Sequence, residues 1–203
     1  PAVRDQHPRL MLHAGQLRQA EGRVEEARRL YLQAAADFEA YQNRTAQGDS
    51  FLALAELELL RGRYAEGIEL GRRAISCWEE GNVRRRAAAL CTLGQMQAYQ
   101  GKLDHADASL KGAEQLILGQ GHPGLTFQLL RTQAWVSYIR GDFRRAMALN
   151  YLAEHEAGQD VPVAIVSTFR NPAPAILGEW GQSEVAAQAT RRRLEAARQI
   201  QDR

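Results

Sequence analysis

The chain has 203 residues, of which 45% are hydrophobic and 25% are charged, a balance typical of folded proteins and not of disordered ones. Its 26 basic and 24 acidic residues give a net charge of +2, so the composition does not favour general nucleic-acid binding. Two cysteines are too few for a disulfide framework, and no apolar run reaches the roughly 20 residues that span a bilayer. These features predict a cytoplasmic protein without a membrane segment.

A five-fold repeat organises the chain. Its signature is a glycine, usually followed two residues later by a large apolar residue and three residues after that by an alanine. The five glycines are separated by 40, 39, 40 and 40 residues, and the first four have an alanine twelve residues later. A fixed period of this length predicts stacked repeats. The glycines are Gly22, Gly62, Gly101, Gly141 and Gly181, and the alanines are Ala34, Ala74, Ala113 and Ala153.

Each repeat predicts two helices joined by a turn at its glycine. Glycine ends the first helix because it adopts the left-handed conformation without a Cβ penalty, and a second amphipathic stretch follows. Such a hairpin cannot bury its apolar face alone, so stacked neighbours must complete the core. The stretch before Gly62 shows the helical spacing of one face in Phe51, Leu54, Ala55, Glu58 and Leu59.

The expected fold is therefore all-α, a right-handed α-solenoid of about five hairpins that forms one domain over residues 1–203. Prolines that fit a first helical turn occur at Pro8, Pro123 and Pro162. The last repeat departs from the pattern, because Pro172 and Pro174 should break or kink its first helix. The predicted repeats cover residues 8–43, 46–82, 84–121, 123–158 and 162–203.

The pattern resembles the tetratricopeptide repeat (TPR), which has a Leu-Gly pair in its first helix, Gly-x-Tyr at the turn and alanines in its second helix. Leu93-Gly94 and Gly62-Arg63-Tyr64 match these features. The period near 40 is longer than the usual 34 or so and is similar to units in large bacterial transcription activators of the MalT-like LuxR group. There, the resemblance implies, such arrays follow an ATPase module and carry inducer binding or autoinhibition.

Catalytic and metal-binding patterns are weak in this sequence. The run from Gly119 to Gly124 matches G-x-G-x-x-G, but a predicted helix precedes it and Pro123 lies inside it, which indicates a structural loop. No histidine stands four residues from another histidine or a cysteine, so no zinc site is expected. Cys77 is expected to be an inert thiol. We predict no catalytic residues and no cofactor.

Two short basic runs, 84–86 and 191–193, consist of three arginines each. Acidic residues lie near both runs, and the weak net charge favours solvated helix faces over a phosphate-binding patch.

The family's geometry places the first helix of each hairpin along an inner groove, where ligands bind. Residues 13, 10, 6 and 3 positions before each turn glycine are then the inner-face residues. Glutamine amides there suit a peptide backbone or sugar hydroxyls, and Arg131, Trp135 and Tyr138 share one helical face with hot-spot composition. The alternative is that Trp135 and Tyr138 pack against the next repeat. The candidate ligand-binding residues are Gln16, Gln19, Glu56, Gln95, Gln128, Arg131, Trp135 and Tyr138.

These features together predict a non-catalytic binding domain for a peptide, a protein segment or a small effector. Because Pro1 stands first instead of Met, and because the repeats resemble those of the MalT-like group, we expect the sensor or interaction region of a larger bacterial transcriptional regulator. No P-loop and no DNA-binding helix-turn-helix occurs in these residues. The alternatives are a free-standing TPR scaffold and, less favoured, an accessory domain of an enzyme. We expect no nucleic-acid contact from this segment, and a homodimer through the end helices is possible.

Overall fold

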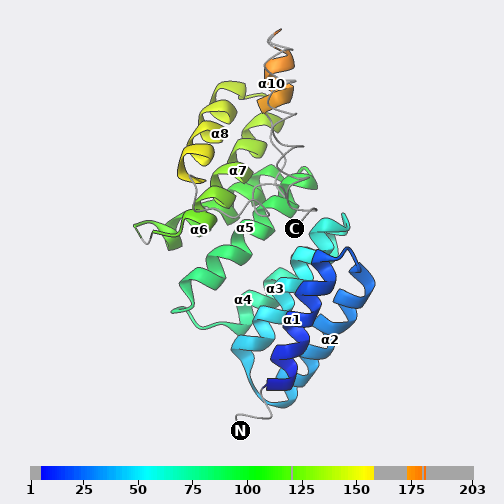
Figure 1. Ribbon diagram of the computed structural model, residues 1–203. Coiled ribbons are helices and arrows are strands. Elements are labelled where there is room, and N and C mark those ends of the chain that lie inside the picture. The colour runs from blue at the N-terminus through cyan, green and yellow to red at the C-terminus, as the bar shows by residue number, and fades with distance from the viewer. Residues whose placement is uncertain (1–5, 120, 158–172, 180, 182–203) are drawn as a thin grey trace. The chain divides into compact units, whose positions relative to one another are not determined.

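The computed structural model describes residues 6–119, 121–157, 173–179 and 181 (Figure 1). These residues form α-helices and turns, with no strand among them, and successive helices pack against each other in α1 to α5 and again in α6 to α8. This arrangement is an α-solenoid, so the predicted fold class is confirmed. The described helices are α1 (Gln6–Ala20), α2 (Val24–Ala40), α3 (Arg44–Leu60), α4 (Tyr64–Cys77), α5 (Val83–Tyr99), α6 (Leu103–Ile117), α7 (Pro123–Ile139), α8 (Phe143–Ala157) and α10 (Ala173–Glu179).

The chain divides into two compact units, residues 1–102 and 103–203. In the first unit each of the helices α1 to α5 packs on the next, and α3 also contacts both α1 and α5. In the second unit α6 packs on α7, α7 on α8, and α8 contacts α10. None of the described helices combines the length and the apolar character that a membrane span requires.

The repeat glycines end the first helices as predicted. All five have left-handed φ angles, 73° at Gly22, 72° at Gly62, 75° at Gly101, 79° at Gly141 and 75° at Gly181. At the first four, the next N–H donates to the carbonyl four residues before the glycine, over 2.8–2.9 Å. This bond closes the C-terminal turn of the helix, and a residue with a Cβ would be strained at the glycine position.

The small residues that recur at fixed positions in the repeats have a packing reason. Ala34, Ala74, Ala113 and Ala153 are each 0% exposed, so they lie where the second helix of a hairpin meets its neighbours. Seven residues before the turn glycines stand four further small residues, all buried, which are Gly15, Ala55, Gly94 and Ala134. Small side chains at both sites let paired helices approach closely, so the repeat period is a packing requirement.

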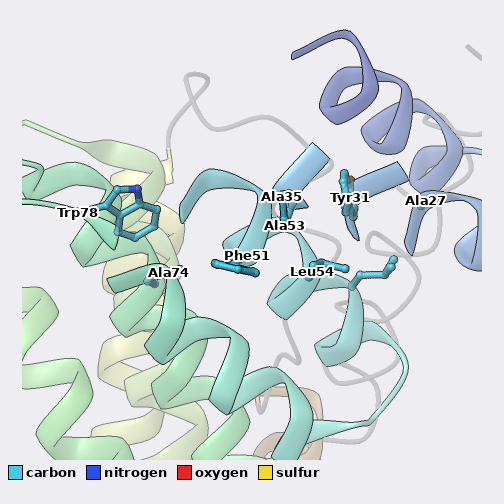
Figure 2. Close-up of a cluster of buried hydrophobic side chains, with 10 residues drawn as sticks. Ala27, Tyr31, Ala35, Phe51, Ala53, Leu54, Ala74 and Trp78 are labelled. Atoms are coloured by element: carbon cyan, nitrogen blue, oxygen red, sulfur yellow. The ribbon is translucent and has the colours of Figure 1, made fainter. Parts of the chain in front are cut away.

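A hydrophobic cluster holds the first unit together, with Tyr31 on α2 and Phe51 on α3 among its members (Figure 2). Two glycines make room for its largest rings. A Cβ on Gly15 would lie 2.4 Å from Cε1 of Tyr31, and one on Gly48 would lie 2.5 Å from Nε1 of Trp78. Both positions therefore require glycine for space, although neither belongs to the turn motif.

The run from Gly119 to Gly124 is an interhelical turn. Gly119 and Gly121 lie between α6 and α7 at φ angles of 74° and 62°, and Pro123 and Gly124 are the first two residues of α7. A helix and not a strand precedes it, which confirms the structural-loop interpretation over a dinucleotide site.

The last predicted repeat is described only in part. Its α10 has Pro174 in the first turn, where proline is tolerated, and Gly181 has the left-handed φ of the other turn glycines. Pro162, Pro172 and Arg191 to Arg193 lie outside the described residues.

Candidate ligand-binding face

The predicted inner face of the first unit is formed by α1, α3 and α5. On α1 and α3, Gln16 and Glu56 are exposed, and Leu52 and Leu59 are half-buried. On α5, by contrast, Gln95 is only 4% exposed. The inner-face residues of α1 and α3 are therefore open to a ligand, whereas those of α5 are largely enclosed.

The two glutamines of α1 differ in their availability. Gln19 is half-buried, and its Oε1 accepts a hydrogen bond of 2.8 Å from the Tyr31 hydroxyl, which joins α1 to α2. Gln16 is exposed, and within the described residues its one side-chain hydrogen bond is 3.2 Å long, between its Oε1 and the ring Nδ1 of exposed His13. Gln16 can therefore turn to a ligand at little cost, whereas Gln19 supports the fold.

Glu56 is an unusual carboxylate. The structure gives it no hydrogen bond or ion pair within the described residues, and desolvation by the surrounding protein raises its pKa from 4.5 to about 7. Its side chain still reaches solvent. Burial, and then the charge of Glu56, raise the pKa of Tyr31, so these side chains lie near each other.

Gln95 presents a second unsatisfied acceptor. Its Nε2 donates to the Tyr99 hydroxyl at 3.2 Å, but its buried Oε1 has no hydrogen-bond partner within the described residues. A buried carbonyl oxygen without a donor costs about 1–3 kcal/mol, and because protein encloses this atom the structure does not present it to a ligand.

The three predicted hot-spot residues of α7 differ in their exposure and partners. Arg131 is 2% exposed, and its Nη1 donates to Asn150 Oδ1 and lies 3.9 Å from a carboxylate oxygen of Glu154, both on α8. The prediction that Arg131 is presented in a groove therefore needs correction, because its guanidinium joins the two helices of its own hairpin. Sequence spacing gave its helix face but not its partner.

The aromatic residues of α7 do come together. The rings of Trp135 and Tyr138 are 5.4 Å apart, and Tyr138 lies 5.7 Å from Phe143 of α8. Trp135, Tyr138 and the predicted Gln128 are all half-buried, so they combine packing with partial access to solvent. This geometry fits the packing alternative for part of each ring and leaves the remainder open to a partner.

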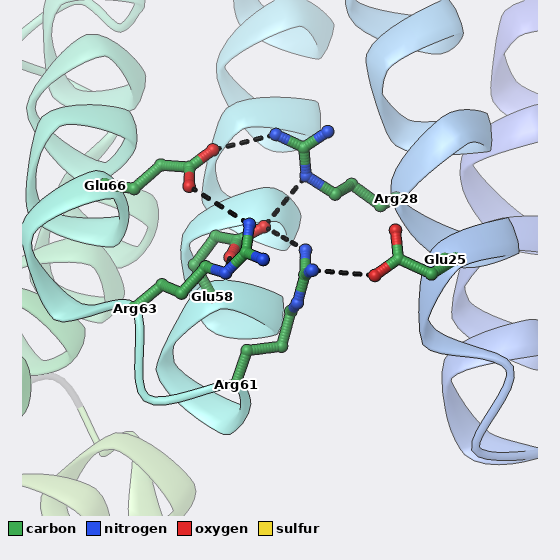
Figure 3. A network of polar contacts seen from close by, with 6 residues as sticks. All are labelled: Glu25, Arg28, Glu58, Arg61, Arg63 and Glu66. Atoms are coloured by element: carbon green, nitrogen blue, oxygen red, sulfur yellow. Dashed lines mark hydrogen bonds and ion pairs between the residues drawn. The ribbon is translucent and has the colours of Figure 1, made fainter.

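A buried charge network that the repeat pattern does not predict lies in the first unit (Figure 3). Glu58 of α3 is 0% exposed, although the helical pattern counts it with the apolar face. Its Oε1 accepts hydrogen bonds of 3.0 Å from both Arg28 of α2 and Arg61. Glu66 accepts from Arg28 at 2.8 Å, and Glu25 accepts from Arg61 at 2.7 Å.

The network links α2, α3 and α4 and so holds these three helices of the first unit together. One signal for it exists in the sequence, since an acid at an apolar helix position has an arginine three residues later, at Arg61. The partner from α2 could not be inferred from spacing alone.

The two cysteines and the basic run at 84–86 show no sign of reactivity or ligand binding. Burial raises the pKa of Cys91 to about 12 and also raises that of Cys77, so both thiols are protonated at neutral pH and are poor nucleophiles. From the basic run at 84–86, Arg85 is engaged with Asp49, with Nε 2.6 Å from Oδ1 and Nη2 3.2 Å from Oδ2. Within the described ranges, no group of three or more His, Cys, Asp or Glu side chains could hold a metal ion.

Comparison with known proteins identifies the fold class. No family model and no curated protein sequence matches the chain. The structure is similar to that of the Rap conjugation gene regulator of the plasmid pLS20 in complex with the Phr* peptide, with a TM-score of 0.79 and 18% identity over 95% of this chain and 53% of that one. It is also similar to BtubC (BKLC) from P. vanneervenii, with a TM-score of 0.65 and 20% identity over 92% of this chain and 78% of that one.

These likenesses define the chain as a TPR-like helical-repeat protein. At such identities they show the fold alone. The chain spans about half the length of the Rap regulator.

Glu56 should make the stability of the protein depend on pH between about 4.5 and about 7. In this range the unfolded chain loses the Glu56 proton, whereas the folded chain retains it. Below pH 4.5 Glu56 is protonated in both states, so burial of its charge costs nothing. Above pH 7 the folded state must hold the charged carboxylate, and the free energy of unfolding therefore decreases as the pH rises from 4.5 to 7. Urea unfolding midpoints of the wild type and Glu56→Gln, measured from pH 4 to pH 8, should diverge across this window in favour of the variant. Parallel curves would contradict the prediction.

Proposed function

We propose that this chain is a non-catalytic peptide-binding helical-repeat region, and that it is the sensor region of a larger bacterial transcriptional regulator. The observation that carries the proposal is its likeness, over 95% of its length, to a conjugation gene regulator whose structure contains a bound peptide. The ligand would lie along the inner face of the first unit, on α1, α3 and α5.

The chemistry of this face supports a peptide over a rigid small molecule. Exposed Gln16 offers both a donor and an acceptor, which match the N–H and C=O groups of an extended backbone. Half-buried Leu52 and Leu59 offer apolar contact between the polar positions. Polar groups separated by apolar surface favour a peptide, whose backbone N–H and C=O groups can reach the polar positions while its apolar side chains contact the surface between them.

The sensor role depends on a coupling between this region and the rest of the regulator. A peptide that binds one arrangement of the helices more tightly than another shifts the population toward that arrangement by its differential affinity. The TPR-like fold suits this task because each repeat contacts only its neighbours, so small changes in packing add along the array.

The test is selection of ligands from a displayed library of random heptapeptides on the whole 203-residue chain, followed by calorimetry of the enriched peptides. We expect Gln16→Ala to weaken binding about 3- to 10-fold, the size of one hydrogen bond. Gln33→Ala, at an exposed position of α2 away from the inner face, serves as the matched control and should bind as the wild type does.

Failure of any peptide to enrich would overturn the proposal, as would binding that Gln33→Ala weakens and Gln16→Ala does not. A thermal-shift screen with sugars and nucleotides then tests the small-effector alternative, since a ligand at about 100 times its Kd adds about 2.7 kcal/mol of stability.

A free-standing scaffold is the second candidate. The likeness to BtubC, over 92% of this chain, supports the helical-repeat fold that a scaffold would also use. A scaffold that holds folded partners would enrich no short peptide, so the same selection separates the two functions.

A further inference from the structure

The second unit lacks the central acid of the buried charge network. Each residue of α6, α7 and α8 corresponds to the residue 79 positions earlier in α2, α3 or α4, since the turn glycines of the two units are separated by that number. At this offset Ser137 stands where the first unit has Glu58, the carboxylate that accepts from two arginines (Figure 3). A small hydroxyl side chain therefore replaces a long, charged one at the same place in the repeat.

Three such positions carry a smaller side chain in the second unit than in the first. The changes, from the first unit to the second, are Tyr31 to Leu110, Leu57 to Val136 and Glu58 to Ser137. The three smaller residues all line one pocket of about 280 Å³, which α6, α7 and the start of α8 form. Pockets for drug-sized ligands measure about 300–1,000 Å³, so this pocket suits a smaller molecule.

Ser137 supplies a buried polar group to the pocket. It is 7% exposed, and within the described residues its hydroxyl makes no hydrogen bond. The hydroxyl of Thr132, on the same helix, instead donates to the Gln128 carbonyl at 2.9 Å. A hydroxyl both donates and accepts, and one left unpaired inside a protein lowers stability. The Ser137 hydroxyl is therefore available to a ligand in the pocket.

Three basic and three acidic side chains line the same pocket. Three of the six are engaged with the protein. Arg140 Nη1 lies 2.5 Å from Asp107 Oδ2, and Asp142 Oδ1 accepts the backbone N–H of Arg145 at 3.1 Å, at the start of α8. These contacts join α6 to the end of α7 and secure the first turn of α8, so they support the wall of the pocket.

The other three charged side chains are Lys111 and Glu114 of α6 and Arg145 of α8, and none of them forms an ion pair with another described residue. The two cations attract a carboxylate, and the carboxylate of Glu114 attracts an ammonium group. A ligand that matches this lining therefore carries both charges.

We propose that this pocket binds a free amino acid, a small zwitterion whose carboxylate contacts Lys111 and Arg145 and whose ammonium group contacts Glu114. The buried Ser137 hydroxyl supplies a further hydrogen bond to the ligand. The pocket belongs to the second unit, so this site is independent of the peptide-binding face proposed for the first.

The experiment is a calorimetric titration of the whole 203-residue chain with each of the standard amino acids. An amino acid that binds is then compared with its N-acetyl derivative and with its C-terminal amide. We expect saturable binding of at least one amino acid. Either blocked derivative should bind at least about 10-fold more weakly, because it loses a hydrogen bond between charged groups.

Two variants, each with a matched control, test whether the ligand lies in the pocket. Ser137→Glu places in the pocket the side chain that Glu58 has in the first unit and should abolish binding. Ser76→Glu makes the same change at an exposed position of α4 and should bind as the wild type does. Lys111→Gln removes a cation and should weaken binding about 10-fold, whereas Lys102→Gln, outside the pocket lining, should not. Circular dichroism checks that each variant is folded.

The outcomes decide the proposal. Absence of binding by every amino acid overturns it, as does binding that Ser137→Glu and Lys111→Gln leave unchanged. A blocked derivative that binds as tightly as the free amino acid also overturns it, because the pocket then does not recognise both charges. If Ser137→Glu loses its helical signal, the exposed Lys111→Gln decides alone. None of these results bears on the peptide selection, which tests a face of the first unit.

Discussion

We expect Trp78→Ala to lower the free energy of unfolding by about 3–5 kcal/mol, the range found when a large buried aromatic side chain is truncated. Trp78 follows α4 in an extended conformation, which turns its indole back onto α3. There it is 4% exposed, fills the space above Gly48, and donates to the Thr45 carbonyl at 3.0 Å. Its removal leaves a cavity between α3 and α4 and deletes their anchoring hydrogen bond. Urea unfolding followed by circular dichroism measures the loss.

The control for this prediction is Leu60→Ala, a truncation on α3 at a side chain that is 57% exposed. It removes little buried surface and should change stability by less than about 0.5 kcal/mol. If the two variants unfold at the same denaturant concentration, Trp78 does not hold α3 and α4 together as described.

The second large effect is expected for Glu58→Ala, which should cost about 2–3 kcal/mol. The carboxylate is fully buried and is the shared acceptor of Arg28 and Arg61. Truncation of one partner in a buried pair usually costs more, but these arginine side chains are 30% and 14% exposed and each keeps a second glutamate. Partial hydration of the released guanidinium groups therefore limits the loss.

Two further substitutions separate charge from position at this network. Glu58→Gln keeps an oxygen acceptor and should lose less than Glu58→Ala, whereas Glu25→Ala removes a side chain that is 71% exposed and should cost less than about 1 kcal/mol. Denaturant unfolding should therefore show Glu58→Ala to be the least stable of the three variants. A Glu58→Ala protein as stable as Glu25→Ala would show that the buried carboxylate is not the centre of the network.

These two sets of contacts hold together the helices that carry the proposed binding face of the first unit. The indole of Trp78 and the Glu58 network tie α4 and α2 to α3 at different sites. Gln16 and Glu56 then project from α1 and α3 without taking part in the core. The contacts that stabilise the first unit therefore use different residues from the proposed binding face.

The sequence by itself determined the repeat and its hairpins. Turn glycines such as Gly62 need a positive φ, and contact positions such as Ala74 need a small side chain. Both are requirements on a single residue, met at the same place in each repeat, so they leave a periodic trace that can be found without coordinates. The same regularity placed Gln16, Glu56, Gln95 and Trp135 at equivalent positions on the first helices.

Only the tertiary structure decided what those positions do. Arg131 joins Asn150 nineteen residues away, and Glu58 receives Arg28 from thirty residues earlier. Both contacts depend on which side chains face each other across packed helices, which periodicity does not specify. The desolvation that raises the pKa of Glu56 likewise comes from surrounding protein and not from sequence neighbours. Periodicity reports requirements that repeat along the chain, whereas partner choice and burial arise at single places in the packed array.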